Sequence, residues 1–298
     1  MPGHRSGFVA VVGRPNAGKS TLMNAFLGEK LAIVSPKPQT TRARQLGILT
    51  RPDAQIIFVD TPGIHSARSP LDEFMVKEAV DSMPDADLVL LLVDASVEPD
   101  ENDRRIGDLV NRARVPAVLA LNKIDLIAAD ALDGKLGAYQ ALTPEALPVP
   151  ISAARGDQVA QLLERLVEML PEGPRFYPSD QLTDTQLRDN AAEIIREKIL
   201  LLFQDEIPHS VAVAVDEFKE RSEQMTYIGA TIYVEKDSQK GILIGQKGSA
   251  LKRIGQTARP DLEEMVGTKV YLELWVKVLK NWRRDARALK RFGYTQKT

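Results

Sequence analysis

Short apolar runs alternate with longer amphipathic stretches along the first part of the chain, up to residue 170. The runs that we predict to be strands cover residues 8–12, 45–50, 56–59, 89–93, 117–121 and 149–153. The stretches with helical spacing cover residues 20–27, 71–83, 101–114 and 158–170. Strands that are apolar along nearly their whole length are buried on both faces, and here helices separate them. The pattern therefore predicts an α/β fold with a mostly parallel sheet.

The segment between the first helix and the second strand is predicted to be mostly irregular. Residues 31–34 fit either a short strand or the start of a loop. Pro36 and Pro38 exclude a helix over residues 35–42. We expect these residues to form an exposed loop.

Three prolines and a glycine interrupt the pattern at residues 171–178. We therefore place one domain at 1–172, a linker at 173–184 and a second domain, which ends in a basic tail, at 185–298. The elements predicted for the second domain are a helix over 185–203, strands over 211–215, 225–235 and 270–278, a glycine-punctuated segment at 240–248 and a helix from Ser249. The first of these helices carries an apolar stripe of Leu187, Ala191, Ile194, Ile195, Ile199 and Leu202. This second domain is predicted to be α+β.

The composition limits which metals the chain can bind and in which cellular compartment we expect it. The 298 residues include no cysteine, which excludes disulfides and thiolate metal sites, and the three histidines are widely separated. Any bound metal is therefore expected to be a hard cation held by oxygen. We find neither a signal-peptide core nor an apolar run that spans a bilayer, so we expect a cytoplasmic protein.

The charge of the chain is divided unevenly along its length. The formal net charge is −2, yet residues 240–298 hold 14 Lys and Arg against 5 Asp and Glu. This part carries +9 and the remainder carries −11. The asymmetry indicates either a surface for a polyanion or ordinary solvated basic helices.

A phosphate-binding loop follows the first predicted strand. The pattern G-x-x-x-x-G-K-S turns backbone N–H groups toward phosphate oxygens, and its lysine and serine supply a cation and a hydroxyl for Mg²⁺. The helix that begins there points its positive end at the same anions. The residues predicted to bind nucleotide in this segment are Gly13, Arg14, Pro15, Asn16, Ala17, Gly18, Lys19, Ser20 and Thr21.

A second group of candidates surrounds the expected γ-phosphate. Asp60 ends a predicted strand at the sheet edge where α/β proteins bind ligands, and the Gly63 N–H follows it. Thr41, or alternatively Thr40, lies in the loop that we expect to close over Mg²⁺. We predict Ser20, Thr41 and Asp60 as metal ligands, and Lys19, Thr41, Asp60 and Gly63 as the catalytic set.

The sequence Asn122-Lys123-x-Asp125 selects guanine over adenine. The Asp125 carboxylate accepts from the N1–H and the exocyclic amine of guanine, whereas adenine leaves it unpaired. Lys123 lies along the base, and the backbone at Ser152 and Ala153 donates to the guanine carbonyl. This base reader argues against a nucleotide kinase, a class that would also need an acceptor site.

The five elements together resemble the translation-factor-related GTPases. The full length of the chain, including residues 38–42 and 241–248, is similar to the bacterial ribosome-assembly GTPases of that class. Ile64 stands where many signalling GTPases have a glutamine that orients water, so we expect slow hydrolysis, in the range of about 10⁻⁴ to 10⁻² s⁻¹. Related GTPases with this replacement can use an asparagine of the phosphate loop to hold K⁺. Asn16 matches that position, and it either holds K⁺ or stabilises the loop.

The second domain has the element order of a type II KH RNA-binding domain. Its G-x-x-G turn, Gly245 to Gly248, precedes a helix, which is the arrangement that lets backbone approach a single-stranded sugar-phosphate chain. The residues predicted to contact RNA are Ile244, Gly245, Gln246, Lys247, Gly248, Lys252, Arg253 and Arg259. We predict an apolar groove floor from Ile242, Ile244 and Ile254, with the alternative that these residues are core.

The resemblance implies the cellular role and the partners of the chain. It implies binding of GTP and GDP with Mg²⁺, binding to the 3′ end of small-subunit ribosomal RNA, and assistance to 30S subunit assembly and maturation. In one alternative, the second domain docks a protein instead of RNA. Residues 280–291 form a basic tail that touches RNA or the inner face of the cell membrane, or that is a plain capping helix. We expect a monomer.

Overall fold

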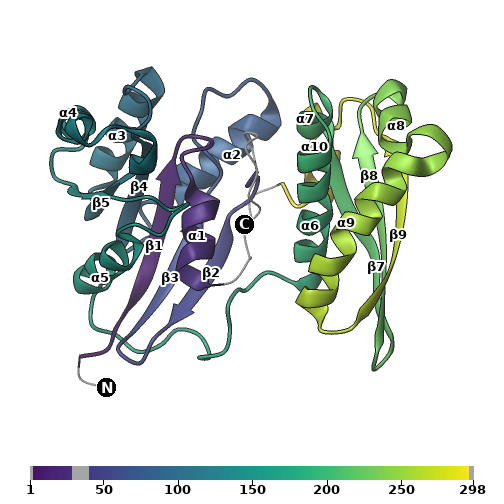
Figure 1. The fold of residues 1–298 in the computed structure, drawn as a ribbon, viewed down its shortest axis with the longest axis horizontal. Coiled ribbons are helices and arrows are strands. Elements are labelled where there is room, and N and C mark those ends of the chain that lie inside the picture. The colour runs from purple at the N-terminus through teal and green to yellow at the C-terminus, as the bar shows by residue number, and fades with distance from the viewer. Residues whose placement is uncertain (1–2, 29–39, 295–298) are drawn as a thin grey trace. The chain divides into compact units, whose positions relative to one another are not determined.

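The computed structural model describes residues 3–28 and 40–294, and these residues form two compact units. The first unit covers residues up to 184 except Ser69–Leu71, which are grouped with the second unit, and the main part of the second unit begins at Thr185. Each unit has its own sheet (Figure 1). The alternative strand at 31–34 and most of the loop predicted at 35–42 lie outside the described residues.

The sheet of the first unit has the strand order β2-β3-β1-β4-β5-β6. Its strands are β1 (Arg5–Gly13), β2 (Gln45–Thr50), β3 (Ala54–Asp60), β4 (Leu88–Asp94), β5 (Ala117–Asn122) and β6 (Leu147–Pro150). Strand β2 pairs antiparallel with β3 and every other pair is parallel, which confirms the mostly parallel sheet. The bounds predicted for the last strand, 149–153, are wrong. The strand begins at Leu147, and Ser152 pairs instead with Asp157 within its own turn.

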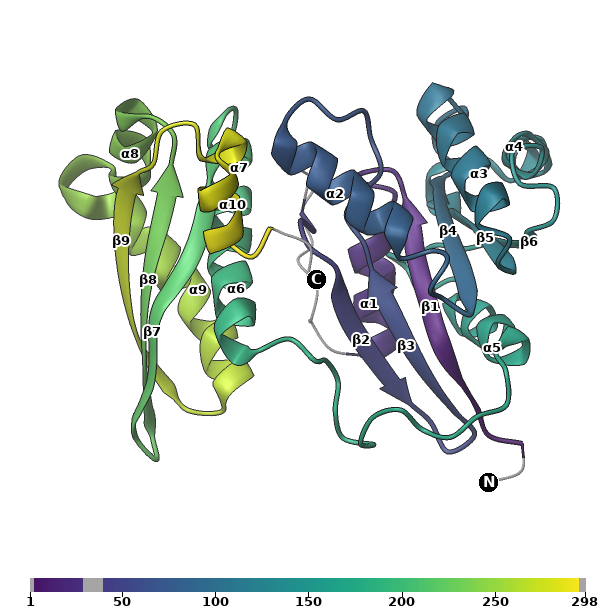
Figure 2. The ribbon, with the colours of Figure 1, turned by 180° about the vertical axis from the view of Figure 1, so that it is seen from behind.

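Helices cover both faces of this sheet (Figures 1 and 2). On one face lie α1 (Lys19–Leu27) and α5 (Val159–Met169), which share a buried core with the strands. On the other lie α2 (Pro70–Asp81), α3 (Glu101–Ala113) and α4 (Leu132–Gln140). The pattern did not predict α4, because Gly134 and Gly137 interrupt its helical spacing. A single fully buried ring, Tyr139, anchors this helix to the core.

The segment predicted as a linker, 173–184, is bound along the first unit. The Ser6 hydroxyl donates to the carbonyl of Pro174 at 2.7 Å. The buried Gln55 side chain accepts from the backbone N–H groups of Phe176 and Tyr177 at 2.7 and 3.0 Å. Farther along, the Ile48 N–H donates to the Leu182 carbonyl. These hydrogen bonds place the division of the chain at Asp184, at the end of the predicted linker.

The second unit has a three-stranded sheet in the order β7-β8-β9. Its elements are α6 (Leu187–Leu202), α7 (Ile207–Ser210), β7 (Ala212–Ser222), β8 (Met225–Val234), α8 (Asp237–Ile244), α9 (Ser249–Val266), β9 (Lys269–Val278) and α10 (Ala286–Arg291). Strands β7 and β8 are antiparallel, and β8 and β9 are parallel. The buried core lies between one face of this sheet and helices α6 and α9. The other face is turned toward the viewer in Figure 2.

Three predictions for the second unit need correction. Residues 237–244 form the helix α8, which Gly241 concealed in the sequence pattern. Strand β7 continues past Val215 through charged residues to Ser222, with a bulge between Val215 and Glu217. In the apolar stripe of α6, Leu187 is 50% exposed, because it lies in the first turn of the helix, outside the buried cluster.

Candidate nucleotide site and nucleic-acid interface

The phosphate-binding loop connects β1 to α1 with a backbone that needs its glycines. Gly13 and Gly18 have φ values of 154° and 101°, and a Cβ atom at Gly18 would collide with the side-chain amide of Asn122. Asn16 is exposed and has a φ of 65°, a conformation that asparagine tolerates better than most residues. The Lys19 side chain folds back over the loop, and its ammonium group donates to the carbonyls of Gly13 and Arg14 at 3.3 and 2.9 Å.

The three predicted metal ligands meet at the start of α1. The Thr41 hydroxyl lies 3.1 Å from Asp60 Oδ2 and 3.2 Å from the Ser20 hydroxyl, which is itself 3.4 Å from the same carboxylate oxygen. All three side chains are buried. This geometry is consistent with Thr41, the residue preferred to Thr40 in the prediction.

One oxygen of this cluster has no protein partner. Asp60 Oδ1 is buried without a hydrogen bond, in a place where two hydroxyl oxygens are close by. In the described part of the chain, no group of three or more His, Cys, Asp or Glu side chains converges to hold a metal. A hard cation at Asp60 would therefore take its remaining ligands from hydroxyls, phosphates and water, as Mg²⁺ does in nucleotide sites.

Lys19 and Asp60 have shifted pKa values for the same physical reason. Burial lowers the pKa of the Lys19 ammonium to about 8, although the Asp60 carboxylate opposes the shift. Burial also raises the pKa of Asp60 to about 6, against the opposing effects of Lys19 and of the hydroxyls of Thr41 and Ser20. pKa shifts of this kind are typical of side chains in sites that bind a charged ligand.

Gly63 and Ile64 follow Asp60 and approach the phosphate loop. A Cβ atom on Gly63 would lie 2.5 Å from the backbone nitrogen of Pro15, so only glycine fits there. The Ile64 N–H donates to the Gly13 carbonyl at 3.0 Å. The Ile64 side chain is only 1% exposed and belongs to the hydrophobic core, so it offers no polar atom to a water.

The predicted base-reading residues form one connected group. Asn122 donates to the Ala17 carbonyl at 2.8 Å and accepts from the Ala153 N–H at 2.9 Å. Its side chain therefore joins the phosphate loop to the turn that follows β6. The Ser152 hydroxyl donates to Asp125 Oδ1 at 2.6 Å and orients that carboxylate. The structure therefore brings together every predicted segment of the nucleotide site within one edge of the sheet.

Two interactions of this site were not predicted. Asp94 forms an ion pair with Lys123 at 2.5 Å, and its pKa is lowered because the hydrogen bonds from Lys123 and Ser96 outweigh the effect of burial. The signal that points to Asp94 is its position at the carboxyl end of β4, where it pairs in register with Asn122.

The second of these interactions fixes the phosphate loop to α3. The Arg14 guanidinium lies 2.8 Å from Asp103 and 3.1 Å from Asp100. Asp100 also caps the first turn of the helix, and Asp103 closes the same capping box. The spacing Asp100-x-x-Asp103 indicates the cap, but nothing in the sequence links it to Arg14.

The G-x-x-G turn lies between α8 and α9. Gly245 and Gly248 have φ values of 69° and 80°, and a Cβ atom at Gly248 would meet nothing within 4 Å, so a ligand can approach its backbone closely. The cationic side chains predicted to contact RNA all point to solvent; they are Lys247, Lys252, Arg253 and Arg259. Gln246 is also exposed, and Ile244 is half-buried.

The predicted groove floor needs correction. Ile254 is fully buried in the core of the second unit, because it faces the sheet from the second turn of α9. Ile242 is 53% exposed, so the alternative that it is a core residue is wrong. Of the three isoleucines, Ile242 and Ile244 therefore remain available to a ligand beside the turn.

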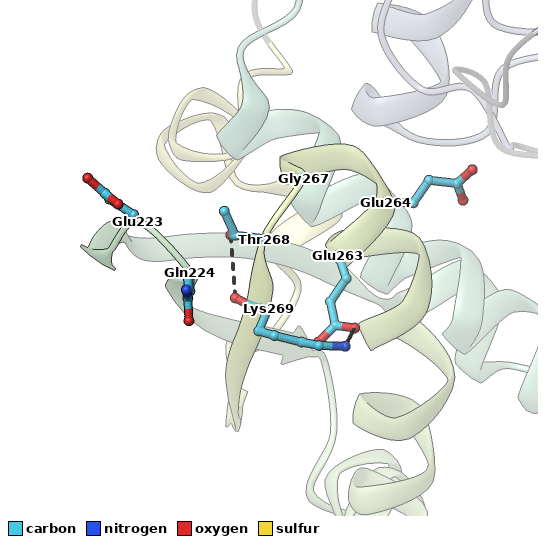
Figure 3. A pocket seen from close by; sticks show the side chains of 7 residues that line it. All are labelled: Glu223, Gln224, Glu263, Glu264, Gly267, Thr268 and Lys269. Carbon is cyan, nitrogen blue, oxygen red and sulfur yellow. Dashed lines mark hydrogen bonds and ion pairs between the residues drawn. The ribbon is translucent and has the colours of Figure 1, made fainter.

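A hollow at the other end of α9 is separate from this turn (Figure 3). It is lined by Glu223, Gln224, Glu263, Glu264, Gly267, Thr268 and Lys269. Lys269 lies 3.3 Å from Glu263 within it. The hollow is acidic, and it does not include any of the predicted RNA-binding residues.

The basic tail packs against the second unit. Trp282 is fully buried and its indole N–H donates to the Ser210 carbonyl at 2.8 Å, while Arg283 lies 2.6 Å from Glu235. This packing favours the capping-helix interpretation for the apolar side of the tail. Its remaining cations are exposed: Lys280, Arg284, Arg287, Lys290 and Arg291. Within the described residues, no helix is long and apolar enough to cross a bilayer.

The comparisons with known proteins agree with both units. Residues 8–123 match the family described as a 50S ribosome-binding GTPase, and residues 206–283 match the KH domain family. The fold and the site thus define a GTPase with a KH domain. The chain is 51% identical over 292 residues to GTPase Era of Geobacter metallireducens, with 98% of each chain covered, and 47% identical to GTPase Era of Halothermothrix orenii. It belongs to the Era family of GTPases.

Solved structures of Era are similar along the full chain. One, Era in complex with MgGDPNP and nucleotides 1506–1542 of 16S ribosomal RNA, superposes with a TM-score of 0.95 at 41% identity. It covers 98% of this chain and is itself covered completely. Another, a variant of Aquifex aeolicus Era bound to GDP.AlF4-, has a TM-score of 0.94 at 40% identity and the same coverage.

Proposed function

We propose that this GTPase couples GTP binding and hydrolysis to binding of the 3′ end of small-subunit ribosomal RNA, and that it assists assembly and maturation of the 30S subunit. The observation that carries the proposal is the presence in one chain of a Ser20–Thr41–Asp60 cluster and an open G-x-x-G turn. The Era structure that superposes on the full chain holds both a nucleotide and RNA.

The phosphate loop supplies the binding energy for the triphosphate. Backbone N–H groups from Gly13 to Thr21 face the phosphates, and Lys19 exchanges its two carbonyl partners for phosphate oxygens. Because Lys19 is already desolvated, its interaction with an anion is strong. Arg14 is bound to α3, so its contribution is to hold the loop in place.

The cluster of Ser20, Thr41 and Asp60 fits Mg²⁺. The buried Asp60 Oδ1 lacks a partner, and hydroxyl oxygens are the other ligands that this ion prefers. When bound, Mg²⁺ neutralises charge on the phosphates. Thr41 links the preceding loop to this cluster, and the Gly63 N–H donates to the γ-phosphate, so both segments respond to the nucleotide state.

Hydrolysis by this site is slow in our proposal, since Ile64 is buried and holds no water. Asn16 offers an amide oxygen on the phosphate loop, and we propose that it helps to hold K⁺ near the phosphates. Guanine is read by Asp125, with Ser152 orienting the carboxylate, Lys123 lying along the base, and Asn122 and Ala153 joining the two ends of the site.

RNA is bound at the G-x-x-G turn. Gly245 and Gly248 let the backbone approach the sugar-phosphate chain, and the exposed cations of α9 lie alongside it. Ile242 and Ile244 are the apolar residues available to bases. Coupling between the two ligands is reciprocal, so bound RNA changes GTP affinity by the factor by which GTP changes RNA affinity. Monomeric state and contact with a membrane surface stay predictions.

The salt dependence of binding tests this proposal against a protein-docking role for the second unit. Neutralising about five phosphates of a single strand gives a log–log slope near −3.5. We expect a slope of this size for a single-stranded RNA from the 3′ end of 16S ribosomal RNA. Absence of RNA binding at low salt would contradict the proposal and favour the protein partner.

A further inference from the structure

The sheet of the second unit has a second face that neither α6 nor α9 covers (Figure 2). On this outer face, Tyr227 of β8 pairs in register with Tyr271 of β9, and Thr231 pairs with Trp275. Tyr271 is 54% exposed and Trp275 is 41% exposed. The two most exposed rings of this unit therefore lie on one strand, on the side opposite the core.

The rings lie over a glycine that leaves room for them. A Cβ atom on Gly229 would be 3.0 Å from the Tyr227 hydroxyl and 3.3 Å from the indole of Trp275. Tyr227 and Tyr271 stack with their centroids 5.9 Å apart and their planes 20° from parallel. The Tyr227 hydroxyl donates to Glu273 at 2.8 Å, which fixes its ring. These contacts fix the rings in place, and we call Tyr227, Tyr271 and Trp275 the aromatic platform.

Cations surround the platform. The Arg221 guanidinium lies 4.2 Å from the centre of the Tyr227 ring and 5.7 Å from that of Tyr271. Lys277 follows Trp275 on the same face of β9, and it is exposed. Neither Arg221 nor Lys277 forms an ion pair with another described residue.

The basic tail continues this charge at the far end of β8. Arg291 donates to the hydroxyl of Tyr233 at 2.5 Å and lies 4.8 Å from the centre of its ring. Exposed Arg284, Arg287 and Lys290 belong to the same tail.

The acidic side chains on the outer face already have partners in the protein. Asp216 accepts from Thr231 at 2.6 Å, Glu217 pairs with Lys219 at 3.0 Å, and Glu273 accepts from Tyr227. Asp285 caps α10 by accepting from the Ala288 N–H. The Glu217–Lys219 pair is neutral, whereas the other three carboxylates keep their charge because their hydrogen-bond donors are neutral. The six cations named above, four of them in the tail, outnumber these three carboxylates, so the surface offers a net positive charge, which matches a polyanion.

We propose that this outer face is a second RNA-binding surface, distinct from the G-x-x-G turn, on which unpaired bases stack against Tyr271 and Trp275. The phosphates of the strand are bound by Arg221, Lys277 and the cations of the tail. Exposed aromatic rings beside cations are the combination that binds single strands with little sequence preference. Tyr271 and Trp275 are four residues apart, about 13 Å along a strand, so they receive separate bases.

This inference rests on the proposed RNA-binding function, and tryptophan fluorescence tests it directly. The chain has two tryptophans, of which Trp275 is exposed and Trp282 is fully buried. Stacking of a base on Trp275 is expected to quench its emission and to protect it from acrylamide. The full-length protein is titrated with a short oligouridine, and fluorescence anisotropy of a labelled copy reports total RNA binding.

We expect oligouridine to quench Trp275, and Trp275→Phe to remove the quenching while anisotropy changes little, because a ring remains. Tyr271→Ala and Arg221→Ala should each shift the quenching curve to about tenfold higher RNA concentration, whereas the matched Tyr271→Phe should not. In Gly248→Asp, which alters the other RNA site, the quenching should persist.

Two results would overturn the inference. In the first, anisotropy shows that RNA binds, but the emission of Trp275 is not quenched by RNA and is still quenched by acrylamide. This result would assign the outer face to a protein partner. In the second, Gly248→Asp abolishes the quenching, which would show that the outer face does not bind RNA independently. A wild-type chain that binds a strand from the 3′ end of 16S ribosomal RNA but not oligouridine would overturn the inference as well, whereas a chain that binds neither RNA would contradict the proposed function itself.

Discussion

The buried Asp60 carboxylate lowers the free energy of unfolding of the protein when no cation is bound to it. Burial raises the pKa of Asp60 in the folded protein to about 6, above its ordinary value of 3.8, so between these values the folded protein binds the proton more tightly than the unfolded chain. The free energy of unfolding therefore decreases as pH rises from about 4 to 6. Lys19 acts oppositely at higher pH, since its lowered pKa of about 8 makes stability recover above that value.

We predict that Asp60→Asn removes the first of these effects. In metal-free and nucleotide-free protein, the variant should gain stability relative to wild type as pH rises from 4 to 6, by on the order of 2–3 kcal/mol. Urea unfolding at each pH measures this difference. A difference that stays constant with pH would show that Asp60 is ionised throughout the range.

Asp125 tests the base-reading role at the same scale. In Asp125→Asn the donor and acceptor pattern reverses, so the preference should move from GTP toward xanthosine triphosphate, with GTP affinity falling about a hundredfold. The matched variant Ser152→Ala keeps the carboxylate but loses its 2.6 Å hydrogen bond, and it should weaken GTP binding without changing the preferred base. Unchanged GTP preference in Asp125→Asn would remove this residue from the base site.

Among the elements, the phosphate loop carries the prediction for K⁺. Wild-type hydrolysis should be faster in KCl than in NaCl at equal ionic strength, and Asn16→Ala should abolish the ratio between the two salts. The ratio is informative because alanine also strains the backbone at a φ of 65°, an effect that is the same in both salts. Equal rates of the wild type in the two salts would leave Asn16 with a structural role in the loop.

The ends of α9 offer a matched pair of glycines for the RNA site. Gly248 precedes the helix with a φ of 80° and Gly267 follows it with a φ of 73°, and a Cβ atom at either would meet no neighbour. Aspartate therefore brings similar strain and equal charge to both. Gly248→Asp should weaken RNA binding at least about tenfold and spare GTP hydrolysis without RNA, whereas Gly267→Asp should preserve RNA binding. Equal RNA affinities of the two variants would contradict the role of the turn.

The sequence pattern predicted most elements because apolar runs and amphipathic stretches have clear periods. It missed α4 and α8, where Gly134, Gly137 and Gly241 break the helical spacing and packing alone keeps the helix. It also extended β6 past Pro150, since Ile151 is apolar although the next residue turns back toward Asp157. Elements that depend on tertiary contacts leave little local signal.

The same limit applied to the site. Motif spacing predicted which residues should share one site, and the structure brings Ser20, Thr41 and Asp60 together. Residues that act through another residue were missed. Asp94 lies 29 positions from Lys123, and Arg14 lies 89 positions from Asp103, so only the folded chain shows that they pair.

At the scale of the whole molecule, the chain joins a GTPase unit to a KH unit that presents a basic turn. Its charge is divided in the same way, with +9 on residues 240–298 and −11 on the remainder. In the proposed function the two sites are coupled, and slow hydrolysis would then limit how long the RNA is held.

The most direct test of this account is the affinity of a single-stranded RNA from the 3′ end of 16S ribosomal RNA, measured with a GTP analogue, with GDP and without nucleotide. We predict the tightest binding with the GTP analogue, by about fivefold or more over GDP, together with an equal effect of the RNA on affinity for the analogue. Equal RNA affinities in the three states would contradict the coupling, even if both ligands bind.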